Sequence, residues 1–301
     1  MPNVVIRPGT LDDAYATFHV FEETLHDLIR RLGETNVEPW DEPEKIARMW
    51  IERRSLFEHL ARAADQFWIA QQDDCVLGFA RSIVRDDVRE LTEFFIRPVG
   101  QSAGVGRELL TRAFPENPAE RRFIIATLDT RAQVRYLKSG MYPQFPICYF
   151  GKAPEARAVE TDLDFTPLTA APAQLAVLDE LDRAVIGYRR SEEHRWLLTD
   201  RSGFLYTRQG RPAGYGYTGK RNGPFALLDA QDYPAVLAHA EANAAGRWEH
   251  FGVEVPMINR VAVDYLLQRD FRLDSFVALF MCDEPFGRWE NYILTSPPLF
   301  V

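Results

Sequence analysis

The chain has 301 residues, of which 46% are hydrophobic and 26% are charged, a composition typical of folded proteins rather than disordered ones. This length predicts about two domains. The formal net charge of -9 argues against nucleic acid as the main partner and is more compatible with a cationic small molecule.

Neither a membrane span nor a disulfide framework is indicated. The apolar runs are short, and the first ten residues, MPNVVIRPGT, lack the hydrophobic region of a signal peptide, so a cytoplasmic protein without a membrane partner is expected. The cysteines Cys75, Cys148 and Cys282 are widely spaced and form no CxxC motif, which favours buried free thiols. The sequence contains no HExxH motif or similar ligand spacing, so no metal site is predicted, and His19 and His26 are expected to be exposed.

The N-terminal half is predicted to alternate between helical and strand periodicity. A first helix is expected from the N-cap Thr10 to Gly33, and a second helix across residues 43–64. The expected apolar face of the first helix consists of Leu11, Tyr15, Phe18, Leu25, Leu28 and Leu32. Three antiparallel strands follow at 66–71, 75–85 and 90–97, and then a helix from about Gly104, a strand at 122–128, a helix at 130–139 and a strand pair within 142–151.

The segment 152–167 is polar, contains two prolines and has no apolar period, so it is predicted to be a linker. Beyond it the pattern starts again, with a helix at 174–187, a hairpin around Gln209–Gly210 and a strand at 223–229.

Two pairs of segments indicate that the second half repeats the first. CVLGFAR and RPAGYGY occupy the same hairpin position, which matches Gly78 with Gly214. DTRAQVRYLKSGM, from Asp129, aligns without a gap with NRVAVDYLLQRDF, from Asn259. A repeat of this length predicts a duplicated domain rather than a solenoid.

The turn GQSAGVGRELL lies between a strand and a helix and is a candidate phosphate site. A dinucleotide fingerprint starting at Gly104 would need glycine where Leu109 stands, and a P-loop would need lysine after Gly106. The remaining pattern, Q-x-x-G-x-G, begins at Gln101. Backbone N–H groups at a helix N-terminus suit a diphosphate without any lysine, and Arg107 adds a cation nearby.

This pattern resembles the pyrophosphate-binding motif of the GNAT superfamily, the acyl-CoA-dependent N-acetyltransferases. The preceding residues Phe94–Pro98 look like the fourth strand of that family, which ends in apolar-x-Pro. DTRAQVRYLKSGM is similar to the family helix N-x-x-A-x-x-L-Y-x-x-x-G-F, with Ala132, Tyr136 and Gly140 in register. The resemblance covers residues 1 to about 151.

The resemblance implies a mixed α/β (α+β) fold with two GNAT-like domains in tandem, each a mostly antiparallel sheet flanked by helices. Residues 1–152 would be the catalytic domain that binds acetyl-CoA, and residues 160–301 a degenerate, structural or substrate-shaping copy. The implied contacts with the pantetheine arm and the thioester are the backbone groups of Phe94, Phe95 and Ile96. The implied diphosphate contacts are Gln101, Ser102, Ala103, Gly104, Val105, Gly106 and Arg107. Asp129 stands where the family has asparagine, and an ionised carboxylate cannot donate the hydrogen bond of that amide.

Acetyl transfer to an amine requires a neutral nucleophile. For an amine with a pKa near 10.4, the neutral form costs about 4.6 kcal/mol at pH 7, so a base or a water relay is expected. Glu93 is the leading candidate, because it precedes the thioester-contacting residues. The alternatives are that Glu93 is only a solvated or ion-paired strand residue, and that the terminal carboxylate of Val301 is the base. Tyr136 is the candidate general acid, or a hydrogen-bond donor to the departing thiolate.

The predicted function is therefore transfer of an acetyl group from acetyl-CoA to a primary amine of a small molecule or peptide. The alternative is a non-catalytic module that only binds acyl-CoA. Trp40 and Asp41 are candidate contacts for a cationic acceptor. In the second half, Asp229 and Asp232 stand where the diphosphate would approach, so we expect one acetyl-CoA per chain.

Overall fold

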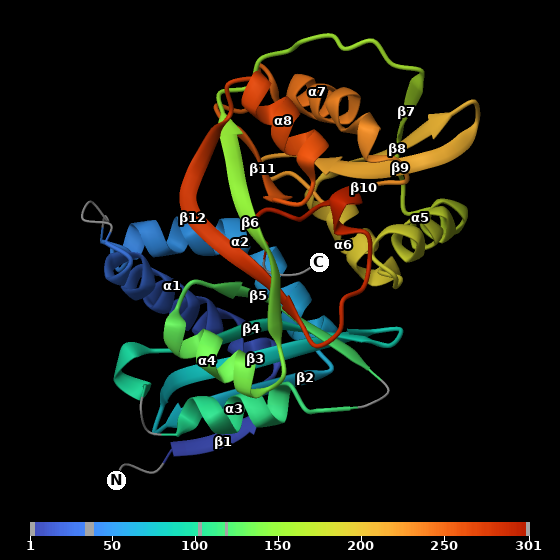
Figure 1. Ribbon diagram of the computed structural model, residues 1–301. Helices are drawn as coiled ribbons and strands as arrows, with labels where there is room; N and C mark the ends of the chain where they lie inside the picture. Colours follow the sequence, from blue (N-terminus) through green and yellow to red (C-terminus); the bar gives the residue numbers. More distant parts are fainter. Residues whose placement is uncertain (1–3, 34–38, 102–103, 118–119, 299–301) are drawn as a thin grey trace. The chain divides into compact units, whose positions relative to one another are not determined.

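The computed structural model describes residues 4–33, 39–101, 104–117 and 120–298 (Figure 1). The chain divides into two compact units, unit 1 (Met1–Phe123) and unit 2 (Ile124–Val301). The boundary lies inside the strand β5 (Arg121–Thr127). The fold is mixed α/β, as predicted, with one sheet of eight strands and one of five.

Unit 1 places its strands in sequential order, β1-β2-β3-β4-β5. The pairs β1–β2, β2–β3 and β3–β4 are antiparallel, which confirms the three successive strands predicted after the second helix. The elements before β5 are β1 (Val4–Pro8), α1 (Ala14–Arg31), α2 (Pro43–Ala63), β2 (Gln66–Gln72), β3 (Cys75–Arg85), β4 (Val88–Ile96) and α3 (Val105–Ala113), with short 3-10 turns at Leu11–Asp13 and Pro98–Gly100.

The start of α1 follows the predicted cap. The backbone N–H of Thr10 donates to the Asp13 carboxylate at 2.8 Å. The same carboxylate pairs with the Arg7 guanidinium at 2.6 Å. The predicted apolar face is only partly correct. Phe18 and Leu28 are buried, whereas Leu11, Tyr15 and Leu32 are 41–48% exposed. Leu11 lies in the 3-10 turn and Leu32 caps the helix, so neither belongs to the regular helical repeat.

The pairing of β3 with β4 contains a β-bulge. Arg81 is opposite Glu93 and Ser82 is opposite Leu91, so Thr92 is an extra residue on β4. The Thr92 hydroxyl donates to the Arg81 carbonyl oxygen at 3.2 Å and holds the bulge. A bulge bends the strand and changes which face the following side chains point to. It therefore sets the direction of Glu93 and of the residues that follow it.

In unit 2 the first sheet continues in the order β5-β12-β6-β11. The predicted strand pair within 142–151 is wrong. These residues form one strand, β6 (Tyr142–Lys152), and its neighbour is β12 (Arg272–Cys282), which runs beside it in Figure 1. The other elements are α4 (Thr130–Lys138), β11 (Phe251–Pro256) and α8 (Arg260–Gln268).

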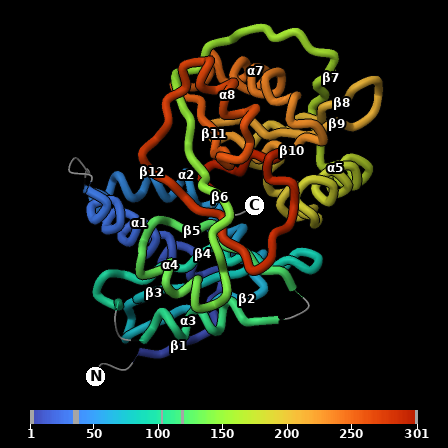
Figure 2. The backbone as a smooth tube through the Cα atoms, in the orientation of Figure 1, coloured from blue at the N-terminus to red at the C-terminus, as the bar shows by residue number. Residues whose placement is uncertain are grey.

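The five-stranded sheet of unit 2 has the order β13-β10-β9-β8-β7. Residues 154–161 are neither helix nor strand, as expected of a linker, and Figure 2 shows them as an extended stretch between β6 and β7. The end of the predicted linker is nevertheless a strand, β7 (Leu163–Pro167). The other elements are α5 (Pro172–Val185), α6 (Ser191–Asp200), β8 (Ser202–Arg208), β9 (Arg211–Thr218), β10 (Phe225–Leu227), α7 (Tyr233–Ala244) and β13 (Tyr292–Ile293).

The structure supports the predicted duplication. Gly78 and Gly214 both lie in the second strand of a hairpin, and the register shifts at the residue immediately before each of them. A Cβ at Gly78 would lie 2.8 Å from the Phe95 carbonyl oxygen, and one at Gly214 would meet the Ala226 carbonyl oxygen. Both glycines therefore allow the next strand to approach closely.

The helices α4 and α8 repeat each other in the same way. Each has nine residues and begins after a residue whose side chain accepts a backbone N–H, Asp129 in one case and Asn259 in the other. Each ends with a 3.0 Å bond, from Met141 N to Tyr136 O in one and from Phe271 N to Leu266 O in the other. The ungapped alignment of the two segments thus corresponds to the same local structure.

Candidate functional site

The predicted phosphate turn in unit 1 leads into the N-terminus of α3. Gly104 is the N-cap residue and has φ +82°, a left-handed conformation that favours glycine. Among the described residues, apart from its neighbours in the chain, none has an atom within 4 Å of the position that a Cβ of Gly104 would occupy. The N–H groups of Arg107 and Glu108 bond to the Gly104 carbonyl oxygen, at 3.0 and 3.3 Å. The N–H groups before them precede the intrahelical bonds, so they are the ones that helix geometry makes available to an anion.

The residues that hold this turn are partly those predicted to bind the diphosphate. The Gln101 side chain donates to the Ile96 carbonyl oxygen at 3.0 Å, so it closes the turn on itself. A Cβ at Gly100 would lie 3.3 Å from both Ile96 and Leu77. Val105 and Gly106 are buried in the first turn of α3. Ser102 and Ala103 lie outside the described residues.

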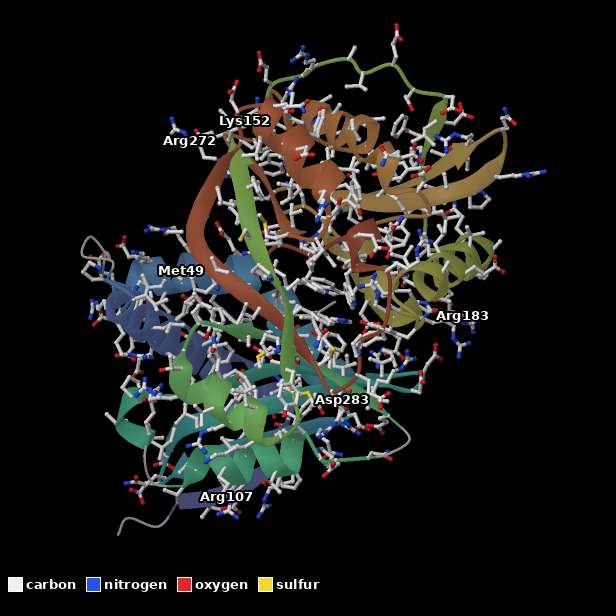
Figure 3. All side chains as sticks on the ribbon, viewed as in Figure 1. Met49, Arg107, Lys152, Arg183, Arg272 and Asp283 are labelled. Carbon is white, nitrogen blue, oxygen red and sulfur yellow. The ribbon has the colours of Figure 1, made fainter. Side chains whose placement is uncertain are left out.

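Arg107 has an exposed side chain on α3, and Figure 3 shows it at the surface of unit 1. The same helix carries Glu108, whose carboxylate pairs with Arg112 at 2.7 Å. Of these two arginines near the turn, Arg107 is thus the one that could approach a bound phosphate without breaking that ion pair.

The end of β4 precedes the turn. Phe94, Phe95 and Ile96 are half-buried and pair with β3 through Ala80, Phe79 and Gly78. The Phe95 ring packs edge-on against Phe21 of α1, with the ring centroids 5.0 Å apart. These backbone groups lie between the bulge and the turn, where the prediction placed the contacts with the pantetheine arm.

Glu93 forms a buried ion pair. Its carboxylate lies 2.6 Å from Nε of Arg81, and both side chains are 0% exposed. The Arg81 guanidinium also donates to the Phe57 carbonyl oxygen at 3.0 Å and contacts the rings of Phe57, Phe67 and Phe79. Burial raises the pKa of Glu93, and the positive charge of Arg81 opposes that increase. Arg81 was not predicted as a site residue. The one feature of the sequence that indicated a buried charge there is an arginine inside the largely apolar strand GFARSIV.

The other two predicted site residues, Asp129 and Tyr136, belong to unit 2. The Asp129 carboxylate accepts the N–H of Arg131 at 2.9 Å and lies 3.4 Å from the Arg131 guanidinium. It therefore caps α4 while keeping its charge paired. Tyr136 is 6% exposed, and burial, followed by the negative charge of Asp129, raises the pKa of its hydroxyl. The phenol consequently stays neutral and can donate a hydrogen bond.

Of the two candidate acceptor contacts in unit 1, Trp40 belongs to an aromatic cluster, and the negative charge of Asp41 acts on His26 in the same cluster. Trp40 lies 6.2 Å from the ring of His19 and 6.3 Å from that of His26. Both histidines are half-buried rather than exposed as expected. Burial lowers the pKa of each, with added repulsion from Arg97 on His19. The two imidazoles thus add little positive charge beside the indole, and the cations near His26 are Lys45, Arg30 and Arg53.

Unit 2 contains a buried polar network that was not predicted from the sequence. His194 lies 2.8 Å from the Tyr217 hydroxyl and 2.9 Å from Asp182, which also pairs with Arg190 at 3.1 Å. Burial alone would raise the pKa of Asp182, but Arg190 and then His194 outweigh it and lower the pKa to about 2. All these groups are buried, so the network stabilises unit 2. Within the described residues, no group of three or more His, Cys, Asp or Glu side chains could hold a metal ion.

The turn of unit 2 that corresponds to the phosphate turn contains its own anions. Asp229 accepts the N–H of Gln231 at 2.9 Å, and the Asp232 carboxylate pairs with Arg208 at 2.7 Å. These aspartates lie at the start of α7, the place where backbone N–H groups would otherwise face a diphosphate. In unit 2 this turn therefore carries two carboxylates of its own, each with a partner inside the unit.

Two of the cysteines match their expectation and one does not. Cys148 and Cys282 are buried, whereas Cys75 is exposed at the start of β3. No helix in the described part of the chain is both long and apolar enough to cross a bilayer.

Comparison with known proteins gives the family and the fold. Residues 25–141 match the acetyltransferase (GNAT) family. Comparison with curated protein sequences gave no significant match. A proposed acetyltransferase from Pyrococcus horikoshii has a similar structure (TM-score 0.72, 14% identity), with 97% of this chain and 94% of that chain covered. A GCN5-related N-acetyltransferase from Sphaerobacter thermophilus gives a TM-score of 0.57 at 14% identity, with 94% of this chain and 96% of that chain covered.

A tandem GNAT protein from the clavulanic acid biosynthesis pathway gives a TM-score of 0.54 at 12% identity, covering 94% of this chain and 99% of that one. At these identities the structural similarity shows the fold alone, and the family match is confined to residues 25–141. This segment of the N-terminal half therefore matches the GNAT acetyltransferase family, and the full chain has the fold of tandem GNAT proteins.

Proposed function

We propose that the N-terminal GNAT domain binds acetyl-CoA and transfers its acetyl group to a primary amine of a small molecule or peptide. The observation that carries this proposal is the left-handed Gly104 at the N-cap of α3, with open space beside it. Unpaired backbone donors and the positive end of the helix dipole suit a diphosphate. The family match over the same segment supports acetyl-CoA as its source.

Tyr136 is proposed to donate a hydrogen bond to the sulfur of CoA as the thioester breaks. Because burial raises the pKa of its hydroxyl, full proton transfer to a thiolate, with an ordinary thiol pKa near 8.5, is uphill. A hydrogen bond to the developing charge still stabilises the transition state.

The acceptor amine must lose a proton, and two routes compete. Glu93 is the candidate base from its position on β4, but its carboxylate is fully buried and already paired with Arg81. This favours the second route, in which water carries the proton away and Glu93 supports β4 through Arg81. The alternative base at Val301 lies outside the described residues.

The charged turn of unit 2 supports a stoichiometry of one acetyl-CoA per chain. Asp229 and Asp232 would repel a diphosphate, and the residues between them have β-carbons where the turn of unit 1 has glycine. The second unit is proposed to be catalytically silent.

Calorimetry with CoA and a thiol-release assay with an amine panel test this proposal. The panel contains polyamines, aminoglycosides, amino acids and peptides with free N-termini. Gly104→Asp should abolish CoA binding. Gly210→Asp is the matched control, because Gly210 also has a positive φ and open space beside it but lies in the β8–β9 turn. Two comparable CoA sites, or tight binding by the Gly104 variant, would contradict the assignment. Binding without turnover on any amine would indicate a non-catalytic acyl-CoA module instead.

A further inference from the structure

Unit 2 contains a cavity of about 350 Å³ that the proposed acetyl transfer does not use. Its lining comes from the start of β6, the end of β12, the segment 285–290 and Ile258 between β11 and α8. The buried part consists of the side chains of Phe145, Phe280, Cys282, Phe286 and Trp289. The exposed rim includes Gln144 and Glu290. Volumes above about 300 Å³ are typical of small-molecule sites.

Aromatic rings form most of the walls. Phe145 and Phe280 are directly opposite in the β6–β12 pair, and their rings stack with centroids 4.8 Å apart and an interplanar angle of 4°. The Trp289 ring lies 4.4 Å from Phe280 and 5.7 Å from Phe286. Such faces bind flat apolar groups, and their quadrupoles attract cations.

The wall formed by residues 285–290 is held in place by hydrogen bonds to backbone carbonyl oxygens. The Trp289 indole N–H donates to the Phe286 carbonyl oxygen at 2.6 Å, and the Arg288 N–H donates to the Val185 carbonyl oxygen at 2.6 Å. Gly287 has φ +69°, and a Cβ there would lie 3.1 Å from the indole nitrogen. Rings that are fixed before a ligand arrives bind it at a lower entropic cost.

The charges around the cavity favour a cation. Of the ten lining residues, all within the described chain, none is Lys, Arg or His, and Glu290 lies at the rim. Asp283, labelled in Figure 3, and Glu284 are the first residues after β12. The Arg288 guanidinium is directed elsewhere, since it donates to the Leu228 carbonyl oxygen and the Asn291 side chain, both at 3.2 Å.

The buried thiol in this cavity does not suggest covalent chemistry. Burial, followed by the negative charge of Asp283, raises the pKa of Cys282 to about 12. A thiol that stays protonated at neutral pH is a poor nucleophile. The site is therefore suited to reversible binding.

We propose that this cavity binds an organic ammonium ion with a flat apolar body, such as an arylalkylamine. The ring would lie against Phe280 and Trp289, and the ammonium group would face Glu290 at the rim. Because each water molecule takes about 30 Å³, the cavity has room for roughly a dozen heavy atoms, which matches an amine with one aromatic ring. This site is defined by residues of unit 2 alone and does not depend on acetyl transfer.

Binding of 2-phenylethylammonium to the full chain tests the proposal, measured by tryptophan emission and by ligand-observed NMR. The neutral probe 2-phenylethanol has nearly the same shape, and butylammonium has the charge without the ring. The aryl ammonium ion should bind about tenfold more tightly than either one, since both the charge and the ring contribute. Trp289→Phe should remove most of the emission change.

Glu290→Gln should weaken binding of the ammonium ion about two- to fivefold and leave the alcohol unaffected, because only the charge changes. Glu284→Gln is the matched control, since Glu284 is a neighbouring exposed acid that does not line the cavity, and it should bind like the parent. Equal affinity for the amine and the alcohol, an equal effect of both substitutions, or no saturable binding would overturn the proposal.

Discussion

Replacing Glu93 by glutamine separates a structural role of this carboxylate from a catalytic one. The substitution keeps the shape of the side chain and removes its charge. Arg81 would then keep a guanidinium that is 0% exposed and has lost its anion. Because arginine does not deprotonate in proteins, the cation cannot escape by titration.

The cost follows from the geometry of the pair. Two charges about 4 Å apart attract each other by about 4 kcal/mol at an effective dielectric near 20. Breaking a buried pair by removing one partner costs about 3–5 kcal/mol, a large share of the roughly 5–15 kcal/mol that stabilises a domain. The bond from Arg81 to the Phe57 carbonyl oxygen remains, so we expect the lower half of that range. The melting temperature should fall by roughly 10 °C.

Urea unfolding measures this loss, with Glu23→Gln as the matched control. Glu23 pairs with Arg97 at 3.2 Å, but both side chains are 24% exposed, so its loss should cost less than about 1 kcal/mol. Replacing Arg81 by Met and Glu93 by Leu together should restore most of the stability, because the buried charge is then gone. A Glu93→Gln variant as stable as the control would refute the reasoning. Loss of turnover and of the acid limb of its pH profile, in a fully stable variant, would instead identify Glu93 as the base.

Three further changes have defined outcomes. Tyr136→Phe should lower turnover in the thiol-release assay about ten- to a hundredfold and change CoA affinity by less than about twofold, because only the hydroxyl is lost; unchanged turnover would remove Tyr136 from the mechanism. Burial and the charge of Asp274 raise the pKa of Glu254 to about 8. Between about pH 4.5 and pH 8 the folded chain therefore keeps a proton on Glu254 that the unfolded chain has lost. The free energy of unfolding should consequently fall as the pH rises from 5 to 9. Glu254→Gln should flatten that decline in urea unfolding, and a parent that gains stability over this range would contradict the assignment. Asp182→Asn leaves the buried guanidinium of Arg190 without its anion and should destabilise unit 2 by about 3 kcal/mol or more, measured by thermal unfolding, whereas a cost under about 1 kcal/mol would show that this ion pair contributes little.

Local signals in the sequence were sufficient for much of the fold. The hairpin turns carry residues with positive φ, Asp73 in one and Gln209–Gly210 in the other, at the predicted positions. The start of α4 at Thr130 and the glycine at the start of α3 were also correct. Each depends on residues a few positions apart, whose backbone preferences are set by steric and hydrogen-bonding rules. The same signals, repeated in both halves, indicated the duplication.

The pairing of β6 with β12 depended on tertiary structure. Residues 142–151 were predicted to form a strand pair, and they contain Pro143 and Pro146. The structure keeps them in one strand, because proline is tolerated where its missing N–H is not needed by the neighbouring strand. The neighbour itself comes from residues 272–282, more than a hundred positions along the chain, and no local pattern specifies a partner at that distance.

At the candidate site, the sequence determined the backbone features and the structure decided the state of the side chains. The Q-x-x-G-x-G spacing was sufficient to place a glycine at the start of a helix, since that conformation is a property of the local chain. The burial of Glu93 against Arg81, and of His194 against Asp182, could not be inferred, because a strand or helix position shows only which face a residue takes and not which charge meets it there. The desolvation and pairing that set the pKa of a carboxylate arise from residues distant in sequence, so only the folded chain determines them.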